Sequence, residues 1–133
     1  MSLTDEQRAD IVAYRIENAH EETRAIESLC REGLYRTAAS RMYYAVYYIV
    51  TAWLIQHGIA NSTHEGVYRN FGLYMVKPGV VTREENRLFK YLFDNRQTGD
   101  YSDNYRIQSD DALPYIEPMR AFIAKVESLI KAH

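Results

Sequence analysis

The sequence contains one cysteine, three prolines and one tryptophan among its 133 residues. Because Cys30 has no second cysteine to pair with, an internal disulfide is excluded, which favours a reducing compartment. The segment Met1–Glu6 is acidic and polar, unlike a secretory signal. The apolar run between Arg41 and His57 is too short to cross a bilayer comfortably. We therefore expect a cytoplasmic protein without a membrane segment.

The motifs of several common enzyme classes are also missing. The sequence has no glycine-rich phosphate loop, no nucleophile elbow and no paired-histidine helix. The four histidines are dispersed and the cysteine is single, so we expect no metal site and no cofactor. No stretch alternates apolar and polar residues over a strand's length, so we expect no β-sheet.

The composition that remains is that of a globular protein, with 47% hydrophobic and 26% charged residues. Its length fits a single domain over residues 1–133. Residues 34–99 carry eight basic and four acidic residues, a surplus of +4 between two acidic flanks. This surplus is too small to indicate tight binding of duplex nucleic acid.

Capping signals and glycines delimit two long helices in the first half of the chain. Thr4 and Gln7 form a capping-box pattern that opens the first helix, and Gly33 is placed to end it. The second helix is expected over about residues 34–57, with Gly58 as its stop.

The second half of the chain predicts shorter elements and one further long helix. Ser62 or Thr63 is expected to cap a short helix, and Thr82 with Glu85 opens another that runs to about Gln97. The short helix is expected to carry three apolar or aromatic residues on one side: Val67, Phe71 and Tyr74.

Residues 99–108 read as a loop, and Ser109 is expected to cap the last helix. Pro118 should kink that helix or delay its true start. We therefore predict an all-α fold, an antiparallel up-and-down bundle of four to five helices.

The second helix is apolar on two sides, as is typical of a central or interface helix. One side is formed by Ala38, Met42, Ala45, Val46, Ile49 and Trp53, and the other by Tyr43, Tyr44, Tyr47 and Tyr48. The tyrosine side either packs against a neighbouring helix or a second subunit, or lines a pocket for a nucleobase or phosphate together with Arg41.

Two other places carry candidate site residues. Arg96 either caps the end of its helix and pairs with Asp100, or holds a phosphate that Asp100 or Tyr101 orients. His64, in the first turn of the short helix, is either a surface residue or part of a site. The other three histidines are expected to be solvated: His20, His57 and His133.

Three segments together resemble the HEPN superfamily, in its small stand-alone prokaryotic branch. They are Gly33–Ala45, then Thr63–Val67 with Phe71, then Arg96–Tyr101, and the resemblance covers roughly residues 5–130. It implies an antiparallel helical bundle, commonly a homodimer, that associates with a minimal nucleotidyltransferase, often as a toxin–antitoxin pair.

The resemblance also implies which residues catalysis would need, because many HEPN members are metal-independent RNases with an arginine and a histidine four to six residues apart. Arg96 matches the arginine, but Tyr101 stands in the histidine's place. A phenol that titrates near ~10 is a poor general base at neutral pH. Arg15 and His20 have the spacing, but they lie about 140° apart in the middle of the first helix, and we treat them as a coincidence.

Three hypotheses follow. The first is a nucleotide- or RNA-linked binding module that acts with a nucleotidyltransferase partner. Its ligand-binding residues would be Arg41, Tyr44, Tyr48, His64, Arg96, Asp100 and Tyr101. The second is an RNase that uses Arg96 with Tyr101 or His64. The third is a homodimeric scaffold, in which protein fully covers Tyr44 and Tyr48.

Overall fold

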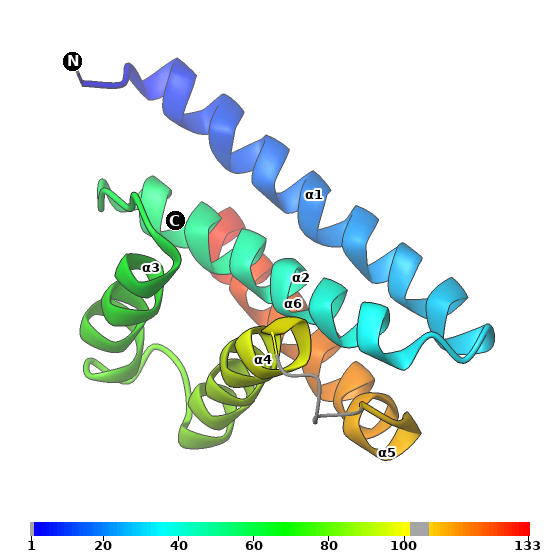
Figure 1. Ribbon diagram of the computed structural model, residues 1–133. Coiled ribbons are helices and arrows are strands. Elements are labelled where there is room, and N and C mark those ends of the chain that lie inside the picture. Colours follow the sequence, from blue (N-terminus) through cyan, green and yellow to red (C-terminus); the bar gives the residue numbers. More distant parts are fainter. Residues whose placement is uncertain (1, 102–106) are drawn as a thin grey trace.

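The computed structural model describes residues 2–101 and 107–133, and for residues 97–101 it describes the backbone alone. Every regular element in this part of the chain is helical (Figure 1). The prediction of an all-α bundle is therefore confirmed. No helix within the described ranges combines the length and apolar character that crossing a bilayer requires.

Helices α1 (Asp5–Arg31) and α2 (Tyr35–Gln56) form an antiparallel pair. The predicted capping box is present, since Thr4 Oγ1 accepts from the Gln7 backbone N–H at 3.0 Å and the Thr4 N–H donates to Oε1 of Gln7 at 2.9 Å. Gly33 and Gly58 adopt φ values of 75° and 76° directly after the two helices. Because this left-handed region suits glycine, both residues end their helices as expected.

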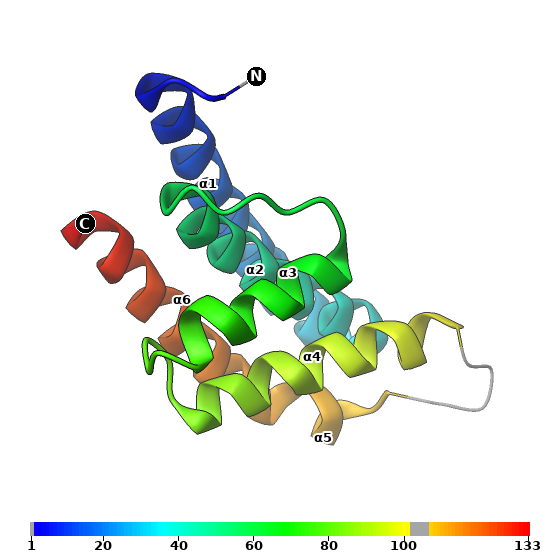
Figure 2. The same cartoon turned by 90° about the vertical axis from the view of Figure 1, so that its left-hand side faces the viewer.

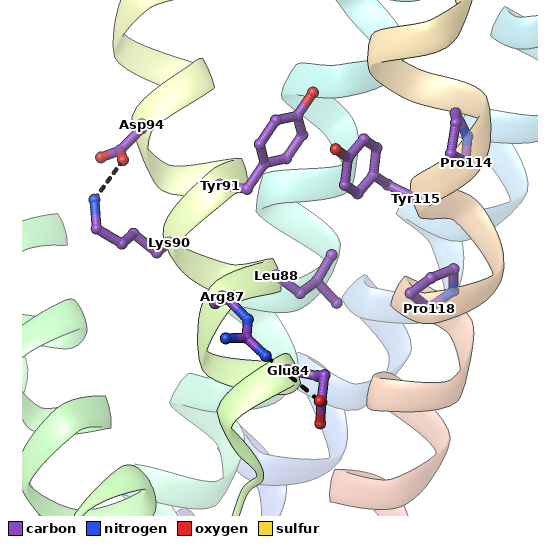
Figure 3. A pocket seen from close by; sticks show the side chains of 9 residues that line it. All are labelled: Glu84, Arg87, Leu88, Lys90, Tyr91, Asp94, Pro114, Tyr115 and Pro118. Carbon is purple, nitrogen blue, oxygen red and sulfur yellow. Dashed lines mark hydrogen bonds and ion pairs between the residues drawn. The ribbon is translucent and has the colours of Figure 1, made fainter.

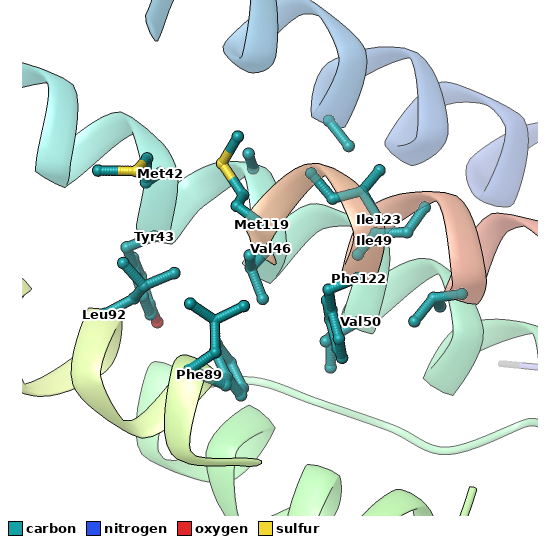
Figure 4. Packing of buried hydrophobic residues seen from close by; sticks show 14 of the residues in the cluster. Met42, Tyr43, Val46, Ile49, Val50, Phe89, Leu92, Met119, Phe122 and Ile123 are labelled. Carbon is teal, nitrogen blue, oxygen red and sulfur yellow. The ribbon is translucent and has the colours of Figure 1, made fainter. Parts of the chain in front are cut away.

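Helix α2 lies at the centre of the molecule and contacts α1, α3, α4, α5 and α6. Its predicted core side is buried, and the buried residues of α4 and α6 pack against it (Figure 4). The contributors include Met42, Val46, Ile49, Phe89, Leu92, Met119, Phe122 and Ile123. The side chain of Tyr43, from the tyrosine side, is fully buried as well.

Helix α3 (His64–Phe71) begins after Thr63, whose Oγ1 accepts from the Gly66 amide at 2.9 Å. A π-helical turn, η1 (Gly72–Val76), follows directly. Because a π turn holds an extra residue, it shifts the inward face by one position. Met75 is fully buried and Tyr74 is 45% exposed, so the prediction that Tyr74 lies on the same side as the buried Val67 and Phe71 was wrong.

Helix α4 (Arg83–Tyr101) opens with the predicted capping box between Thr82 and Glu85. Glu85 also accepts a hydrogen bond from Lys125 of α6 at 2.8 Å, which ties the two helices together. The helix does not end near Gln97 but continues to Tyr101, so part of the predicted loop is helical. It lies beside α3 and η1 in both views (Figure 2).

The C-terminal part begins with the short helix α5 (Ser109–Ala112) and the 3-10 turn η2 (Leu113–Tyr115). The cap of α5 is Gln108, so Ser109 is not the cap. The Gln108 backbone N–H donates to Oδ2 of Asp111, and the Gln108 carbonyl accepts from the Asp111 N–H, both at 2.9 Å. Helix α6 (Ile116–Ala132) starts two residues before Pro118. Proline is tolerated in a first turn, which is why the true start is delayed as predicted.

Candidate functional site

The candidate site lies where α2, α3 and α4 meet and is built around Tyr43. The phenol oxygen of Tyr43 lies 2.7 Å from Nδ1 of His64, the first residue of α3. The Tyr43 ring also stacks with Tyr47 and with Phe89, at centroid distances of 5.8 and 6.0 Å. Tyr43 is therefore held from three helices while its hydroxyl is directed to a single imidazole.

The imidazole of His64 lies among the tyrosines of α2. It stacks on Tyr47 with ring centroids 4.7 Å apart and planes at 29°, and it meets Tyr44 edge to face at 6.0 Å. The Thr63 cap fixes the start of α3 and thereby the position of His64. The structure thus brings His64 into the tyrosine cluster, and it is not a surface residue separate from it.

Arg96 of α4 supplies a positive charge to the same place. Its guanidinium carbon lies 5.1 Å from the centroid of the Tyr43 ring and 5.3 Å from that of Phe93. Both distances fit cation–π contact. Nε of Arg96 is buried and has no hydrogen-bond partner within the described part of the chain. We name Tyr43, Tyr44, Tyr47, His64 and Arg96 the tyrosine–histidine site.

Burial and the Arg96 charge set the protonation states in this site. Burial raises the pKa of Tyr43 well above its usual value, although Arg96 opposes the shift, so the phenol keeps its proton. Burial and then the Arg96 charge lower the pKa of His64, while Glu65 opposes them. At neutral pH the site therefore holds a neutral imidazole and a charged guanidinium.

Arg41 and Tyr48 extend the site along α2. The Arg41 guanidinium lies 4.8 Å from the Tyr44 centroid, and it donates to Glu22 of α1 at 3.0 Å. Tyr48 lies 6.4 Å from Tyr44, ring to ring, and 6.0 Å from the guanidinium of Arg15. Both predicted residues thus adjoin the tyrosine–histidine site, but an acid already pairs with Arg41.

The side chains of Asp100 and Tyr101 lie outside the described residues. The backbone of α4 continues past Arg96, so Arg96 is not at the end of its helix. The reading of Arg96 as a cap of the last carbonyls was therefore wrong.

Arg15 and His20 do not form a joint site. Arg15 donates to Thr51 of α2 at 3.1 Å, whereas His20 pairs with Glu127 of α6 at 2.6 Å. The two side chains of α1 are engaged by different helices, as their separation around α1 led us to expect.

The sequence did not indicate the Tyr43–His64 bond. It did indicate the stacking of Tyr43 on Tyr47, because the two residues are one helical turn apart. His64 lies 21 positions after Tyr43, and no local pattern connects the two. Tyr44 and Tyr48 are half-buried in the single chain, so its own residues do not cover them fully.

A hollow lies on the other side of α4 from the tyrosine–histidine site, between α4 and the segment from η2 to α6 (Figure 3). It has a volume of about 530 Å³, and Tyr91 and Tyr115 stack in its wall with centroids 4.1 Å apart. The charges on its rim form pairs, Lys90 with Asp94 and Arg87 with Glu84. None of the predicted site residues lines it.

No potential metal site is present in the described ranges, where no three His, Cys, Asp or Glu side chains gather. What the tyrosine–histidine site offers is a cation, a neutral imidazole and aromatic faces. Such a set suits an anionic ligand with a planar ring.

The model of the HEPN domain family matches residues 12–129 of the chain. A protein of Thermotoga maritima named "UPF0332 protein" is 29% identical over 94% of this chain and 95% of its own length. Two proteins of Methanocaldococcus jannaschii named "Putative toxin" are 29% and 30% identical. The first match covers 97% of this chain and 95% of the relative, and the second covers 86% and 78%.

Proposed function

This chain belongs to the HEPN domain family, and we propose that it is a binding module for nucleotides or RNA that acts with a minimal nucleotidyltransferase partner. The observation that carries the proposal is the placement of Arg96 and His64 against the same buried phenol, Tyr43. These residues come from three helices, so the fold, and not a local motif, assembles the site.

Each part of the site matches one part of a nucleotide. A guanidinium binds phosphate through charge-assisted hydrogen bonds, and Arg96 is only partly buried, so a ligand can reach its charge. The half-buried rings of Tyr44 and Tyr47 offer faces on which a base can stack. We propose that Arg41, Tyr48, Asp100 and Tyr101 extend this surface along the backbone of a longer ligand.

The proposed setting is a toxin–antitoxin-like pair in the cytoplasm. Support comes from two relatives that carry a toxin name and from the family resemblance. We further propose a homodimer, as the family resemblance implies. Copurification with the product of a neighbouring nucleotidyltransferase gene tests the pairing, and light scattering tests the dimer.

Binding of AMP and of a short single-stranded RNA, measured by calorimetry, tests the ligand. The wild type should bind both, and Arg96→Ala should weaken binding roughly ten- to hundredfold, as for loss of a charged hydrogen bond. Arg87→Ala is the matched control, because Arg87 is an exposed arginine of the same helix. Equal and negligible binding by all three proteins would refute the proposal.

A second candidate function is RNA cleavage, which the proximity of His64 to Arg96 favours, with Tyr101 as the other candidate for the missing histidine. The purified protein should then cut a structured RNA without added metal. Cleavage must be lost in both Arg96→Ala and His64→Ala, because activity that survives both variants comes from another site or from a contaminant.

A further inference from the structure

We propose that Tyr43 is a positioning residue that holds neutral His64 with its proton on Nε2, so that His64 donates a hydrogen bond to a phosphate oxygen beside Arg96. This inference rests on the function proposed above and names the part of the ligand that the site binds. It assigns His64 the role of a hydrogen-bond donor and not of a proton acceptor.

The argument begins with the 2.7 Å contact between the Tyr43 hydroxyl and Nδ1 of His64. The bond has two possible directions. Either the phenol donates to an unprotonated Nδ1, or a protonated Nδ1 donates to the phenol oxygen. A neutral imidazole carries one proton, so the first direction puts that proton on Nε2 and the second puts it on Nδ1.

The surroundings of Tyr43 decide between the two directions. The Tyr43 side chain is fully buried, and its hydroxyl makes no hydrogen bond to any other described residue. If the oxygen accepted from Nδ1, the phenolic proton would be buried without an acceptor, which is costly. If the phenol donates, its proton is satisfied. The first direction is therefore favoured, and Nε2 carries the imidazole proton.

The neighbouring rings fix the direction in which this N–H points. Tyr47 stacks on the face of the imidazole and Tyr44 meets it edge to face, so the ring plane is held from two sides. Nε2 of His64 makes no hydrogen bond to a described residue and is not among the buried unpaired atoms. No described residue therefore occupies it, and we propose that a ligand does.

The charged groups around His64 favour an oxyanion as that ligand. Arg96 contacts the same Tyr43 ring and supplies a positive charge, and Glu65 is the acid whose charge reaches the imidazole. Among the side chains that the structure describes, the other titratable groups that face it are the phenols of Tyr43, Tyr44 and Tyr47. An oxygen that accepts from both Nε2–H and the guanidinium has the geometry of a phosphate contact.

The same assignment limits what His64 does in catalysis. A neutral imidazole that carries its proton on Nε2 has no free lone pair towards the ligand, so it does not serve as a general base there. To become one, it would have to move its proton to Nδ1, which breaks the bond that Tyr43 donates.

The experiment is nitrogen NMR of the histidine rings in the full chain, combined with AMP binding by calorimetry. In the wild type at neutral pH, His64 should show a protonated Nε2 and an unprotonated Nδ1. Tyr43→Phe keeps the buried ring and removes the hydroxyl. It should mix the two tautomers and weaken AMP binding roughly three- to tenfold, as for one neutral hydrogen bond.

Tyr68→Phe is the matched control, because it likewise removes one phenol hydroxyl from a tyrosine of α3 that lies outside the site and stacks on Phe93, not on His64. It should leave the tautomer and the AMP affinity unchanged.

A proton on Nδ1 of His64 in the wild type overturns the inference without the use of any variant. So does a Tyr43→Phe protein with wild-type tautomer and affinity, and in that case AMP binding by the wild type leaves the proposed function standing. If the wild type binds neither AMP nor RNA, the proposed function itself fails, whatever the tautomer.

Discussion

The guanidinium of Arg41 donates a 3.0 Å hydrogen bond to Glu22, so an acid from α1 neutralises the arginine that lies over Tyr44. Arg96 differs from it, because its Nε is buried without a partner in the described part of the chain. Two arginines border one aromatic surface, and one of them is already engaged by a carboxylate.

This difference predicts unequal effects on nucleotide binding. Arg41→Ala should weaken AMP binding less than Arg96→Ala does, since Glu22 already offsets the Arg41 charge. Glu22→Gln should free the Arg41 charge and strengthen binding by up to about fivefold at low salt, in line with a partly exposed ion pair. Calorimetry at low and high salt measures both effects, and a Glu22→Gln protein that binds more weakly contradicts the prediction.

The alanines on the core side of α2 predict a loss of stability on enlargement. Ala38 and Ala45 are fully buried in close-packed surroundings. Their replacement by leucine should lower the free energy of unfolding by roughly 1–3 kcal/mol, because the added methyl groups have no space. Urea denaturation measures this, with exposed Ala124→Leu of α6 as the control. Equal urea midpoints for all three variants would show that the neighbouring helices move to accommodate the larger side chain without loss of stability.

The π turn after α3 predicts a contrast between two neighbouring residues. Met75→Ala should cost roughly 2–5 kcal/mol of unfolding free energy, since the side chain is fully buried. Tyr74→Ala should change it by less than about 0.5 kcal/mol, because the ring is on the surface. A larger loss for Tyr74→Ala would mean that α3 continues as a regular helix.

The pH dependence of stability follows from His64. Burial and the Arg96 charge lower the pKa of His64 in the folded protein, whereas the unfolded chain titrates near ~6.5. As pH falls through that value, the unfolded chain takes up a proton that the folded protein does not. The free energy of unfolding therefore falls. Because His64 is partly exposed, the loss is a fraction of the ~1.4 kcal/mol that one pKa unit represents.

Urea denaturation at about pH 7.5 and pH 5.5 measures this loss. His64→Asn keeps an acceptor for the Tyr43 hydroxyl and cannot titrate, so it should lose less stability than the wild type over this range. The pH-dependent contributions of the other histidines to stability cancel in this comparison, because both proteins contain them. Identical losses would contradict the assigned direction of the His64 pKa.

Much of the fold was predictable because its signals are local. Thr4 and Gln7 lie within one turn, and Gly33 ends α1 through its own backbone preference. Failures occurred where a non-local contact decides the outcome. The register of η1 depends on Met75 entering the core. The backbone of α4 also continues past Gln97 and through Gly99, which was expected to begin a loop.

Three members of the site were predicted as candidate residues, namely Tyr44, His64 and Arg96, but the contacts that join the helices were not predicted. The spacing of Tyr43, Tyr44 and Tyr47 puts them on one side of α2 by helical geometry alone. That His64 meets them follows from how α3 packs across α2, and that Arg96 reaches the Tyr43 ring follows from the position of α4. No local spacing in the sequence predicts either contact.

Chemical-shift mapping of AMP on the labelled protein tests the binding surface most directly. We expect the largest shifts at the His64 ring and at the Tyr44 and Tyr47 side chains, with loss of all of them in Arg96→Ala. Shifts confined to the hollow lined by Tyr91 and Tyr115, or shifts that persist unchanged in Arg96→Ala, would contradict nucleotide binding at the tyrosine–histidine site.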